Sequence, residues 1–369
     1  MKIAIIGAGP AGLFFALLLK RARPTDEIVV TEQNPRHATF GFGVVFSKGA
    51  LGFLERDEPG MHARLAQAME SWPQQRIVHR DVTVDIDGNG FSAIGRLRLL
   101  EILQDACSRA GVELRFERPL AELPAGFDLV VGADGIHSTV RASLPFEPQV
   151  ERLTNRFVWY GTTRVFECLT LTFRESEHGP FVAHHYRYSP AMSTFLVECE
   201  AATWHRAGFE RMTDEESRAY CETVFARDLA GHRLVSNKSV WRTFALLANK
   251  IWSIGNAVLI GDALRTGHFS IGSGTRLAMD DAIALARAFE ARGDDVPAAL
   301  AEFERARRPV VEKLVAAANR SSTWYERLSE KMALDPWALA YDYMTRSGRV
   351  SRERLRQEAP QFMQQVEAR

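Results

Sequence analysis

The sequence predicts a mixed α/β fold with a Rossmann-like nucleotide-binding domain, an inserted antiparallel β-sheet domain and a C-terminal helical region. Short continuous apolar runs, which are typical of buried parallel strands, occur at residues 3–6, 28–30, 127–131 and 257–260. Between the last two, residues 156–200 contain runs rich in aromatic and β-branched residues, a pattern that favours an antiparallel sheet. Beyond residue 290 the pattern is helical.

The first apolar run leads into a glycine-rich turn and then into a predicted helix. Gly7 permits the tight turn, Gly9 lets a pyrophosphate approach the backbone, and Gly12 lets helix and strand pack closely. Glu32 follows the second run, where a carboxylate accepts hydrogen bonds from a ribose. Because the Gly-Ala-Gly-Pro segment breaks the first run, the N-terminus does not resemble a secretory signal. The pattern predicts a dinucleotide site and leaves NAD and FAD open.

Composition predicts a soluble cytoplasmic enzyme. The 369 residues are 46% hydrophobic, which allows a large core and two domains. Lys and Arg together number 46, as do Asp and Glu, so the net charge gives no general attraction to nucleic acid or to membranes. The four cysteines have no Cys-x-x-Cys spacing and no companion histidines, so we expect reduced core thiols and no metal site.

Two further segments are candidates for ligand contacts. Residues 40–47 place Gly43 and a second glycine beside aromatic residues, which indicates backbone close to a flat ligand, although an ordinary glycine turn has the same composition. An amphipathic helix is predicted over residues 96–110, with Leu99 on its inner face. Arg96 at its start could clamp a phosphate, because a guanidinium binds two phosphate oxygens; a solvated arginine is the alternative.

Two loops follow the third and fourth apolar runs, at the strand ends where ligands of open α/β sheets collect. Asp134 and Gly135 follow the third run, and Asp262 follows the fourth. Gly272 and Gly274 then precede a predicted helix, whose N-terminus offers positive potential to a ligand. In isolation, an Asp-containing turn with a glycine-rich cap explains the second loop equally well.

Together these motifs resemble those of the FAD-dependent aromatic hydroxylases of the para-hydroxybenzoate hydroxylase fold, over residues 1–290. The resemblance implies FAD as cofactor and NADH or NADPH as transient co-substrate. It also implies the cofactor-binding residues: Gly7, Gly9, Gly12 and Glu32 for the ADP half, Arg96 for phosphate, Asp134 and Gly135 for the loop serving flavin and nicotinamide, Asp262 for the ribityl chain, and Gly43, Gly272 and Gly274 beside the flat ring.

The expected domains follow from this resemblance. The FAD-binding domain is expected to be discontinuous and to comprise residues 1–75, 95–150 and 245–320. The substrate-binding β-sheet domain is expected at residues 76–94 and 151–244, and the C-terminal helices at residues 321–369.

Segments 39–47, 157–162 and 267–275 are similar to hydroxylases that act on salicylyl-CoA or 2-aminobenzoyl-CoA, and to the tryptophan-derived hydroxylase of violacein biosynthesis. There are two departures from the wider family. Arg265 stands near where many relatives have a histidine, and residues 269–271 replace a proline before the paired glycines. No reductase half follows, so we expect a free-standing, single-component hydroxylase.

The resemblance implies hydride transfer to FAD, capture of O2 as a C4a-hydroperoxide, and attack on it by an electron-rich aromatic carbon. The protein must orient the ring and exclude water. A side chain that accepts a proton from the substrate's hydroxyl or amino group would help. The catalytic candidates are His268, His184, His185 and Tyr160, each of which is explained equally well as a packed side chain when taken singly. His268, in the flavin-proximal loop, is the first choice.

We expect a small aromatic substrate and O2 as reaction partners, no nucleic acid or membrane, and a monomer or homodimer. An aryl-CoA thioester hydroxylated at the 5-position ranks above a free indole, tryptophan-derived or phenolic metabolite. A basic lip for CoA could come from Arg36, Lys48, Arg80 or residues 346–356, although solvated arginines are the alternative explanation. The missing Trp-x-Trp-x-Ile-Pro segment disfavours a halogenase. A non-catalytic flavin-binding redox sensor is a further class left open.

Overall fold

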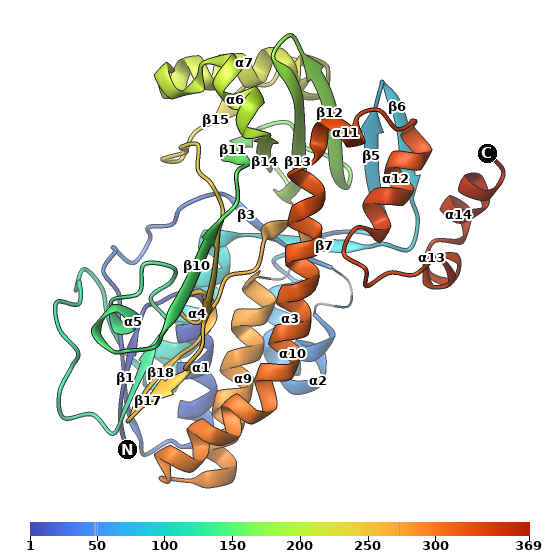
Figure 1. The fold of residues 1–369 in the computed structure, drawn as a ribbon. Coiled ribbons are helices and arrows are strands. Elements are labelled where there is room, and N and C mark those ends of the chain that lie inside the picture. Colours follow the sequence, from blue (N-terminus) through green and yellow to red (C-terminus); the bar gives the residue numbers. More distant parts are fainter. Residues whose placement is uncertain (48, 50, 273) are drawn as a thin grey trace. The chain divides into compact units, whose positions relative to one another are not determined.

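The computed structural model describes residues 1–47, 49, 51–272 and 274–369, with the backbone alone at Phe53. The chain folds into parallel and antiparallel sheets with a helical C-terminal part (Figure 1), as the sequence predicts. It divides into two compact units. Unit 1 comprises residues 1–39, 97–151 and 245–316, and unit 2 comprises residues 40–96, 152–244 and 317–369.

Unit 1 is built on a six-stranded sheet in the order β17-β18-β9-β1-β2-β8. Its strands are β1 (Lys2–Ile6), β2 (Glu27–Thr31), β8 (Glu113–Arg115), β9 (Leu129–Gly132), β17 (Ser253–Ile254) and β18 (Ala257–Leu259). All neighbours pair in parallel except β17, which is antiparallel to β18. Because β1, β9 and β18 are adjacent, the loops that leave their carboxyl ends share one edge of the sheet.

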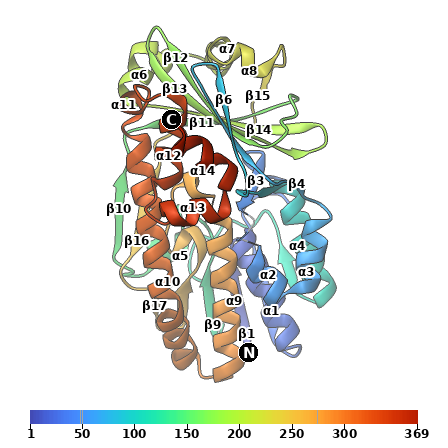
Figure 2. The ribbon, with the colours of Figure 1, turned by 90° about the vertical axis from the view of Figure 1, so that its right-hand side faces the viewer.

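Helices of unit 1 connect and cover these strands. They are α1 (Pro10–Ala22), α4 (Arg96–Ala110, in unit 1 from residue 97), α5 (Thr139–Ser143), α9 (Gly274–Arg292) and α10 (Val296–Tyr325, in unit 1 to residue 316). Helix α1 packs against α9 (Figure 2), and the side chains of residues 11–19 are buried. A two-stranded ribbon pairs β10 (Pro148–Arg152) with β16 (Ala245–Asn249). The predicted helix at 96–110 is confirmed, with Leu99 fully buried.

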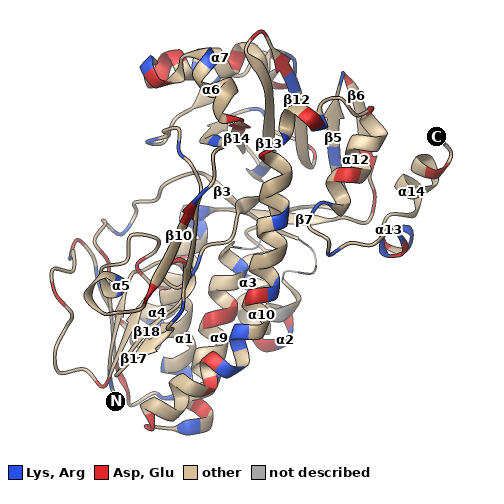
Figure 3. Cartoon of the chain, viewed as in Figure 1, with Lys and Arg blue, Asp and Glu red and all other residues tan. Residues whose placement is uncertain are grey.

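Charges of both signs are interspersed along α10 (Figure 3). Glu302 pairs with Arg305 and Glu304 with Arg308, at spacings that place oppositely charged side chains on the same helix face. This alternation fits the balanced composition. Within the described residues, no helix combines the length and apolar character that crossing a bilayer requires.

Unit 2 contains a seven-stranded sheet in the order β15-β11-β14-β13-β12-β5-β6. Its strands are β5 (Gln75–His79), β6 (Val82–Ile86), β11 (Arg156–Thr162), β12 (Leu169–Ser176), β13 (Gly179–Ser189), β14 (Met192–Cys199) and β15 (Leu234–Val235). Only β12 and β5 pair in parallel. A smaller sheet pairs β3 (Gly43–Ser47), β7 (Phe91–Gly95) and β4 (Glu70–Trp72). Strands β11 to β14 form the antiparallel sheet that the composition of residues 156–200 predicts.

Alternate residues of the large sheet point into two different cores. Phe181 and Ala183 face one core, which includes Phe209 and Cys221, and Val182 faces the other. The helices of the first core are α6 (Ala201–Ala207), α7 (Asp214–Val224) and α8 (Ala226–Leu229), with a short 3-10 turn at Phe209–Arg211. The helices near the second are α11 (Leu328–Lys331), α12 (Pro336–Thr345), α13 (Arg352–Glu358) and α14 (Pro360–Glu367). Two short helices, α2 (Gly52–Asp57) and α3 (Pro59–Ala66), lie between β3 and β4 in the chain.

The compact units differ from the expected domains in two segments. Residues 40–75 group with the sheet unit, because β3 and β4 pair with β7. Residues 321–369 do not form a region of their own, because Leu339 and Phe362 pack with the β5 and β6 side chains Ile77 and Ile86. Helices α7 and α8 follow each other directly in the chain, with a break at Phe225.

Candidate flavin and active-site residues

The turn after β1 accepts only glycine at two positions. Gly7 has a φ of +106°, and a Cβ there would lie 2.3 Å from the carbonyl oxygen of Ala133. A Cβ on Gly12 would lie 2.1 Å from the carbonyl oxygen of Gly7. Gly9 differs, because nothing lies within 4 Å of a Cβ built on it. Gly7 and Gly12 therefore allow the strand and the helix to pack closely, whereas the space beside Gly9 is open to a ligand.

The Glu32 carboxylate is fixed beside this turn. One oxygen accepts a hydrogen bond from the Ala8 amide at 3.0 Å. The other accepts from the Asn34 amide at 2.9 Å and from the Asn34 side chain at 2.7 Å. These bonds aim the carboxylate toward the glycine turn, where a ribose of an adenosine group would lie.

Asp134 shapes the loop after β9. Its Oδ2 accepts from the amides of Thr139 and Val140, at 2.7 and 3.3 Å, in the first turn of α5. Its Oδ1 is buried and has no hydrogen-bond partner within the described part of the chain. The guanidinium of Arg141 donates to the carbonyl oxygen of Ala263 at 2.9 Å and to that of Ile136. Burial lowers the Arg141 pKa from its ordinary value. Arg141, which the sequence did not single out, thus joins the loops that follow β9 and β18.

The loop after β18 contains two 3-10 turns, Gly261–Ala263 and Phe269–Ile271. Asp262 is exposed on the first. Gly272 ends the second turn with a φ of +59°, and α9 begins at Gly274, where nothing lies within 4 Å of a built Cβ. Gly272 and Gly274 therefore lie directly before and at the start of α9, as the sequence predicts.

A buried charge cluster holds the first of these turns. The Asp281 side chain is fully buried and accepts from the Gly261 amide at 3.1 Å. It also accepts from Arg265 Nη2 at 3.1 Å and from Arg307 Nε at 3.0 Å. Arg265 Nη1 donates in addition to the carbonyl oxygen of Gly261 at 3.1 Å. Arg265, which stands near where many relatives have a histidine, therefore has a structural role. Together with Asp281 it fixes the turn that carries Asp262.

His268 forms part of the second turn and is 2% exposed. Its Nδ1 lies 2.9 Å from Ser270 Oγ and accepts from the Ser270 amide at 3.4 Å. The ring packs on Phe269, with centroids 4.2 Å apart. Because both bonds use Nδ1, they fix the ring orientation and leave the hydrogen of the neutral imidazole on Nε2.

His185 and Tyr160 lie in unit 2, in or beside the core near α7. His185 Nε2 lies 2.9 Å from Thr172 Oγ1, and its ring stacks on Phe195. Burial lowers the pKa of His185 to about 3, so the imidazole is neutral. The Tyr160 hydroxyl lies 3.0 Å from Ser217 Oγ, and burial raises its pKa. Both side chains take part in core packing.

His184 projects from the opposite face of β13. Its ring packs on Tyr325, with centroids 5.3 Å apart, and Nε2 lies 3.7 Å from Glu198 Oε2. Glu198 is 1% exposed and accepts from Asn155 Nδ2 at 2.9 Å. This is a second, buried polar cluster in unit 2, separate from the packing of His185.

Gly43 and Arg96 also belong to unit 2 and line one pocket there. A Cβ on Gly43 would lie 2.6 Å from Tyr188 Cβ, and the Gly43 amide donates to Thr194 Oγ1 at 2.9 Å. The Tyr186 hydroxyl donates to the Gly43 carbonyl oxygen at 2.9 Å. The glycine is therefore required for the close approach of β3 to the large sheet. Arg96 is exposed at the start of α4.

Three observations in unit 1 fit a bound FAD. The space beside Gly9, Gly135 and Gly274 is open. The N-terminus of α1 has no side-chain cap, so its amides can meet a phosphate. Asp134 Oδ1 is buried without a partner among the described residues, and a ligand hydroxyl or amide could supply one. The donor set of this edge therefore matches a dinucleotide.

The residues expected to form a basic lip are mostly engaged elsewhere. Arg80 donates to the carbonyl oxygens of Met332 and Ala333, and Arg36 lies 3.7 Å from Asp105. In the 346–356 tract, Arg346 donates to Ser321, while three other arginines pair with Glu358 or Glu367. Lys48 lies outside the described residues.

Comparison with known proteins shows which family this chain resembles. A model of the FAD binding domain family matches residues 125–318. Salicyloyl-CoA 5-hydroxylase from a Streptomyces species is 41% identical over 94% of this chain and 70% of that protein. Protodeoxyviolaceinate monooxygenase from Chromobacterium violaceum is 39% identical over 90% of this chain and 91% of that protein. The structure of 2-methyl-3-hydroxypyridine-5-carboxylic acid oxygenase, in its tetrameric form, superposes with a TM-score of 0.73 at 17% identity and covers 90% of this chain and 95% of that one, so it shows the shared fold.

Proposed function

Because the chain belongs to the FAD-dependent aromatic monooxygenases, we propose that it hydroxylates the ring of an aryl-CoA thioester at the 5-position, with salicylyl-CoA or 2-aminobenzoyl-CoA as the substrate. The observation that carries the substrate is the 41% identity to salicyloyl-CoA 5-hydroxylase over nearly the whole chain. NADH or NADPH supplies the electrons. FAD, the cofactor of this family, supplies the activation of O2 when bound.

The protein's own task is to hold FAD and to orient the aromatic ring. In this proposal the α1 amides and Gly9 contact the pyrophosphate, and Glu32 accepts from a ribose. Asp134 with Gly135, and Asp262 with Gly272 and Gly274, contact the remainder of the cofactor. The buried Asp134 Oδ1 and the cluster around Asp281 support these roles, because both concern loops at the same sheet edge.

We propose that His268 donates a hydrogen bond through Nε2–H to the oxygen or nitrogen of the ring's hydroxyl or amino group, because Nδ1 accepts from the Ser270 amide and Nε2 then carries the hydrogen of the neutral ring. This bond stabilises the deprotonated form of that group, whose ring carbon is more nucleophilic. The bonds of Nδ1 to Ser270 support this role, because they orient the imidazole. His184 is the second candidate. His185 and Tyr160 are not retained, because their polar atoms bond within the packed side chains of unit 2.

A variant tests the role of His268. His268→Ala removes the Nε2–H donor, so it should lower kcat, and more NAD(P)H should be consumed per product. Ser270→Ala leaves the imidazole but removes one orienting partner, so a smaller decrease is expected. Unchanged kcat and coupling in His268→Ala would eliminate this residue.

We also propose a cytoplasmic location, because the four cysteines are buried as free thiols and the reaction needs reduced nicotinamide. A monomer or homodimer remains our proposal for the assembly, to be measured by light scattering.

A substrate panel tests the function. The FAD-loaded protein is assayed for NADH and NADPH oxidation with salicylyl-CoA, 2-aminobenzoyl-CoA, the two free acids and tryptophan, with mass spectrometry of the products. Strong stimulation by a CoA thioester, with one oxygen atom added, is expected. Stimulation by tryptophan or another free aromatic alone would instead favour the indole chemistry of the violacein-type relative.

A further inference from the structure

One face of the large sheet in unit 2 carries a buried carboxylate beside a histidine. Glu198 on β14 is 1% exposed, and His184 on β13 is 8% exposed. Glu198 Oε2 lies 3.7 Å from His184 Nε2, a distance that permits an ion pair but exceeds that of a hydrogen bond. Within the described residues, this carboxylate oxygen accepts no hydrogen bond. A buried carboxylate oxygen needs a donor or a positive charge, and His184 can supply either.

The carboxylate is held in place from its other side. Its Oε1 accepts from Asn155 Nδ2 at 2.9 Å, and the same amide nitrogen donates to the carbonyl oxygen of Tyr325 at 2.9 Å. The Asn155 backbone amide donates to the Glu326 carboxylate at 2.8 Å. Turning Glu198 away from His184 would therefore break a buried hydrogen bond, which is costly.

His184 shares its sheet face with a residue of the pocket assigned to the cofactor. Leu196 on β14 pairs with His184 on one side and with Trp159 of β11 on the other, so the three side chains lie on one face. Trp159 lines the pocket that also contains Gly43, which we assign to the flat ring of FAD. Neighbouring strands are about 4.8 Å apart, so the Cα atoms of Trp159 and His184 are separated by about 10 Å. An aromatic substrate beside the flat ring is therefore within reach of this face.

The other ionisable groups around the pair keep one charge state. The Tyr325 ring packs on His184 with centroids 5.3 Å apart, and burial raises the pKa of Tyr325 well above its ordinary value, so its hydroxyl stays neutral. The Arg346 guanidinium lies 6.0 Å from the Tyr325 centroid and stays charged. His185 projects to the opposite face, where burial lowers its pKa to about 3. Glu198 is therefore the group that sets the tautomer and charge of His184.

A carboxylate beside one ring nitrogen fixes the tautomer of a neutral histidine. The negative Oε2 of Glu198 favours the hydrogen of His184 on Nε2, so Nδ1 is the acceptor nitrogen. His268 has the opposite role, because its Nδ1 accepts from Ser270 and its Nε2 carries the hydrogen. Its Nε2–H can stabilise a deprotonated substrate group but does not take up the proton. The proposed reaction therefore needs a separate proton acceptor.

We propose that Glu198 is a positioning residue that makes His184 the proton acceptor of the hydroxylation. The O–H or N–H bond of the ring substituent breaks, its electron pair stays on the substituent, and a new N–H bond forms at His184 Nδ1. The imidazolium pairs with Glu198 and later returns the proton to the substituent of the hydroxylated ring. This assignment rests on the proposed function, because the substrate must carry the group that loses the proton.

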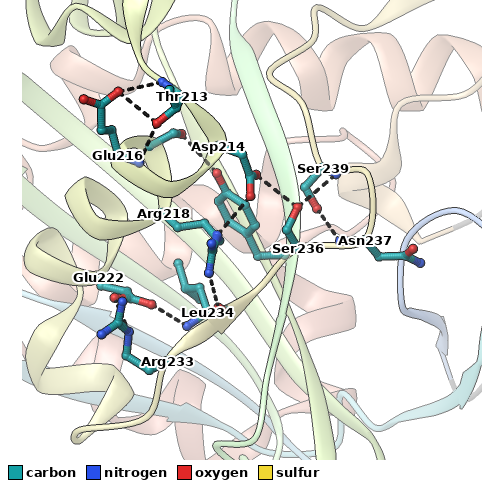
Figure 4. A network of polar contacts seen from close by, with 12 residues as sticks. Thr213, Asp214, Glu216, Arg218, Glu222, Arg233, Leu234, Ser236, Asn237 and Ser239 are labelled. Atoms are coloured by element: carbon teal, nitrogen blue, oxygen red, sulfur yellow. Dashed lines mark hydrogen bonds and ion pairs between the residues drawn. The ribbon is translucent and has the colours of Figure 1, made fainter.

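Three variants and one matched control separate this role from a structural one. Glu198→Gln keeps the size of the side chain, but its amide donates to Nε2 and moves the ring hydrogen to Nδ1. Glu198→Asp keeps the charge, and His184→Gln removes the imidazole. The control is Glu222→Gln, the same change in the polar network between α7 and the segment 233–239 (Figure 4). There the amide oxygen can still accept from the Leu234 amide, 2.7 Å from Glu222 in the wild type, and the exposed ion pair that is lost contributes little.

The first readout needs no substrate. In ¹⁵N NMR spectra of the FAD-loaded protein with labelled histidine, the His184 signals are identified by their absence in His184→Gln. The wild type and Glu222→Gln should show the Nε2–H tautomer of His184, and Glu198→Gln should show the Nδ1–H tautomer.

The second readout is the hydroxylation of the aryl-CoA thioester. The kcat should fall at least about tenfold in Glu198→Gln and about 100-fold in His184→Gln, with KM within about twofold of wild type, because the interaction is made in the transition state. The acidic limb of the kcat profile should move to lower pH in Glu198→Gln, because the imidazolium loses its counter-charge. Glu198→Asp should recover part of kcat, and Glu222→Gln should match wild type.

The outcomes distinguish this proposal from the proposed function. If no aryl thioester is hydroxylated but Glu198→Gln changes the tautomer, the pairing of Glu198 with His184 stands and the substrate assignment falls. If thioesters are hydroxylated and Glu198→Gln keeps the wild-type kcat and pH profile, the base is refuted and the function stands. A loss of kcat with an unchanged tautomer and acidic limb would also overturn the assignment, because Glu198 would then act through packing alone. If Glu198→Gln does not fold, wild-type kcat in His184→Gln refutes the base by itself.

Discussion

The variant Gly9→Ala tests whether glycine is required at this position for ligand binding and not for folding. Gly9 has φ −78° and ψ 177°, which alanine adopts freely, and nothing lies within 4 Å of its built Cβ. Alanine lowers the conformational entropy of the unfolded chain, and this stabilises the folded apo protein by about 0.4–1 kcal/mol. Alanine is a poorer N-cap than glycine, and this costs about the same. The free energy of unfolding of the apo protein should therefore stay within ~1 kcal/mol of wild type.

The same methyl group should obstruct FAD. If the pyrophosphate lies against the Gly9 backbone, the added Cβ occupies its position, and the Kd for FAD should rise at least about tenfold, or ~1.4 kcal/mol. Quenching of flavin fluorescence measures the Kd, and urea unfolding of the apo protein measures stability.

Gly12→Ala is the matched control. Its Cβ would lie 2.1 Å from the carbonyl oxygen of Gly7 and 3.2 Å from Ile5 Cγ2, so helix and strand must separate. The free energy of unfolding of the apo protein should fall by about 1–3 kcal/mol or more. If Gly9→Ala binds FAD as tightly as wild type while remaining folded, the pyrophosphate does not lie at this turn and the reasoning fails.

Three further changes test other parts of the structure. The pKa of His185 is lowered to about 3 in the folded chain, whereas its ordinary value in the unfolded chain is about 6.5. As pH falls, the unfolded chain therefore takes up the proton first. The stability that is present above pH 6.5 is lost as pH falls toward 3, by up to ~1.4 kcal/mol per pH unit. Urea unfolding at pH 7 and pH 5 should show a smaller loss in His185→Gln than in wild type, and equal losses would contradict this. Asp281→Asn should destabilise by about 3–5 kcal/mol, because it leaves two buried guanidinium groups without their counter-charge, and unfolding within ~1 kcal/mol of wild type would refute the role of the cluster. Gly161→Ala should lower the Tm because its Cβ would lie 2.4 Å from the Phe42 ring; the double variant with Phe42→Ala should recover part of the loss, and an additive decrease would argue against that contact.

Locally encoded features could be predicted from the sequence. The β1 strand, the glycine turn and α1 follow from apolar runs and glycine spacing within about twenty residues, the range over which such patterns act. The strands β11 to β14 follow from their composition. Strand alternation also carried a signal that was not used. His185 shares its strand face with Phe181 and Ala183, which favours a core position over an exposed one.

Contacts between distant segments could not be predicted. Asp281 meets Arg265 and Arg307 across 16 and 26 residues, and no local pattern marks such a pairing. The pairing of β3 with β7, which removes residues 40–75 from the expected domain, is likewise non-local. The left-handed backbone at Lys238 was also missed, because the preceding asparagine is the residue that composition favours for that conformation.

Incorporation of labelled oxygen tests the central claim most directly. The FAD-loaded protein is supplied with NADH or NADPH, salicylyl-CoA and ¹⁸O₂, and the product is analysed by mass spectrometry. The account predicts a hydroxylated CoA thioester with one ¹⁸O atom on the ring and nearly one nicotinamide oxidised per product. Nicotinamide oxidation that yields only hydrogen peroxide, with no labelled product from salicylyl-CoA or 2-aminobenzoyl-CoA, would contradict it.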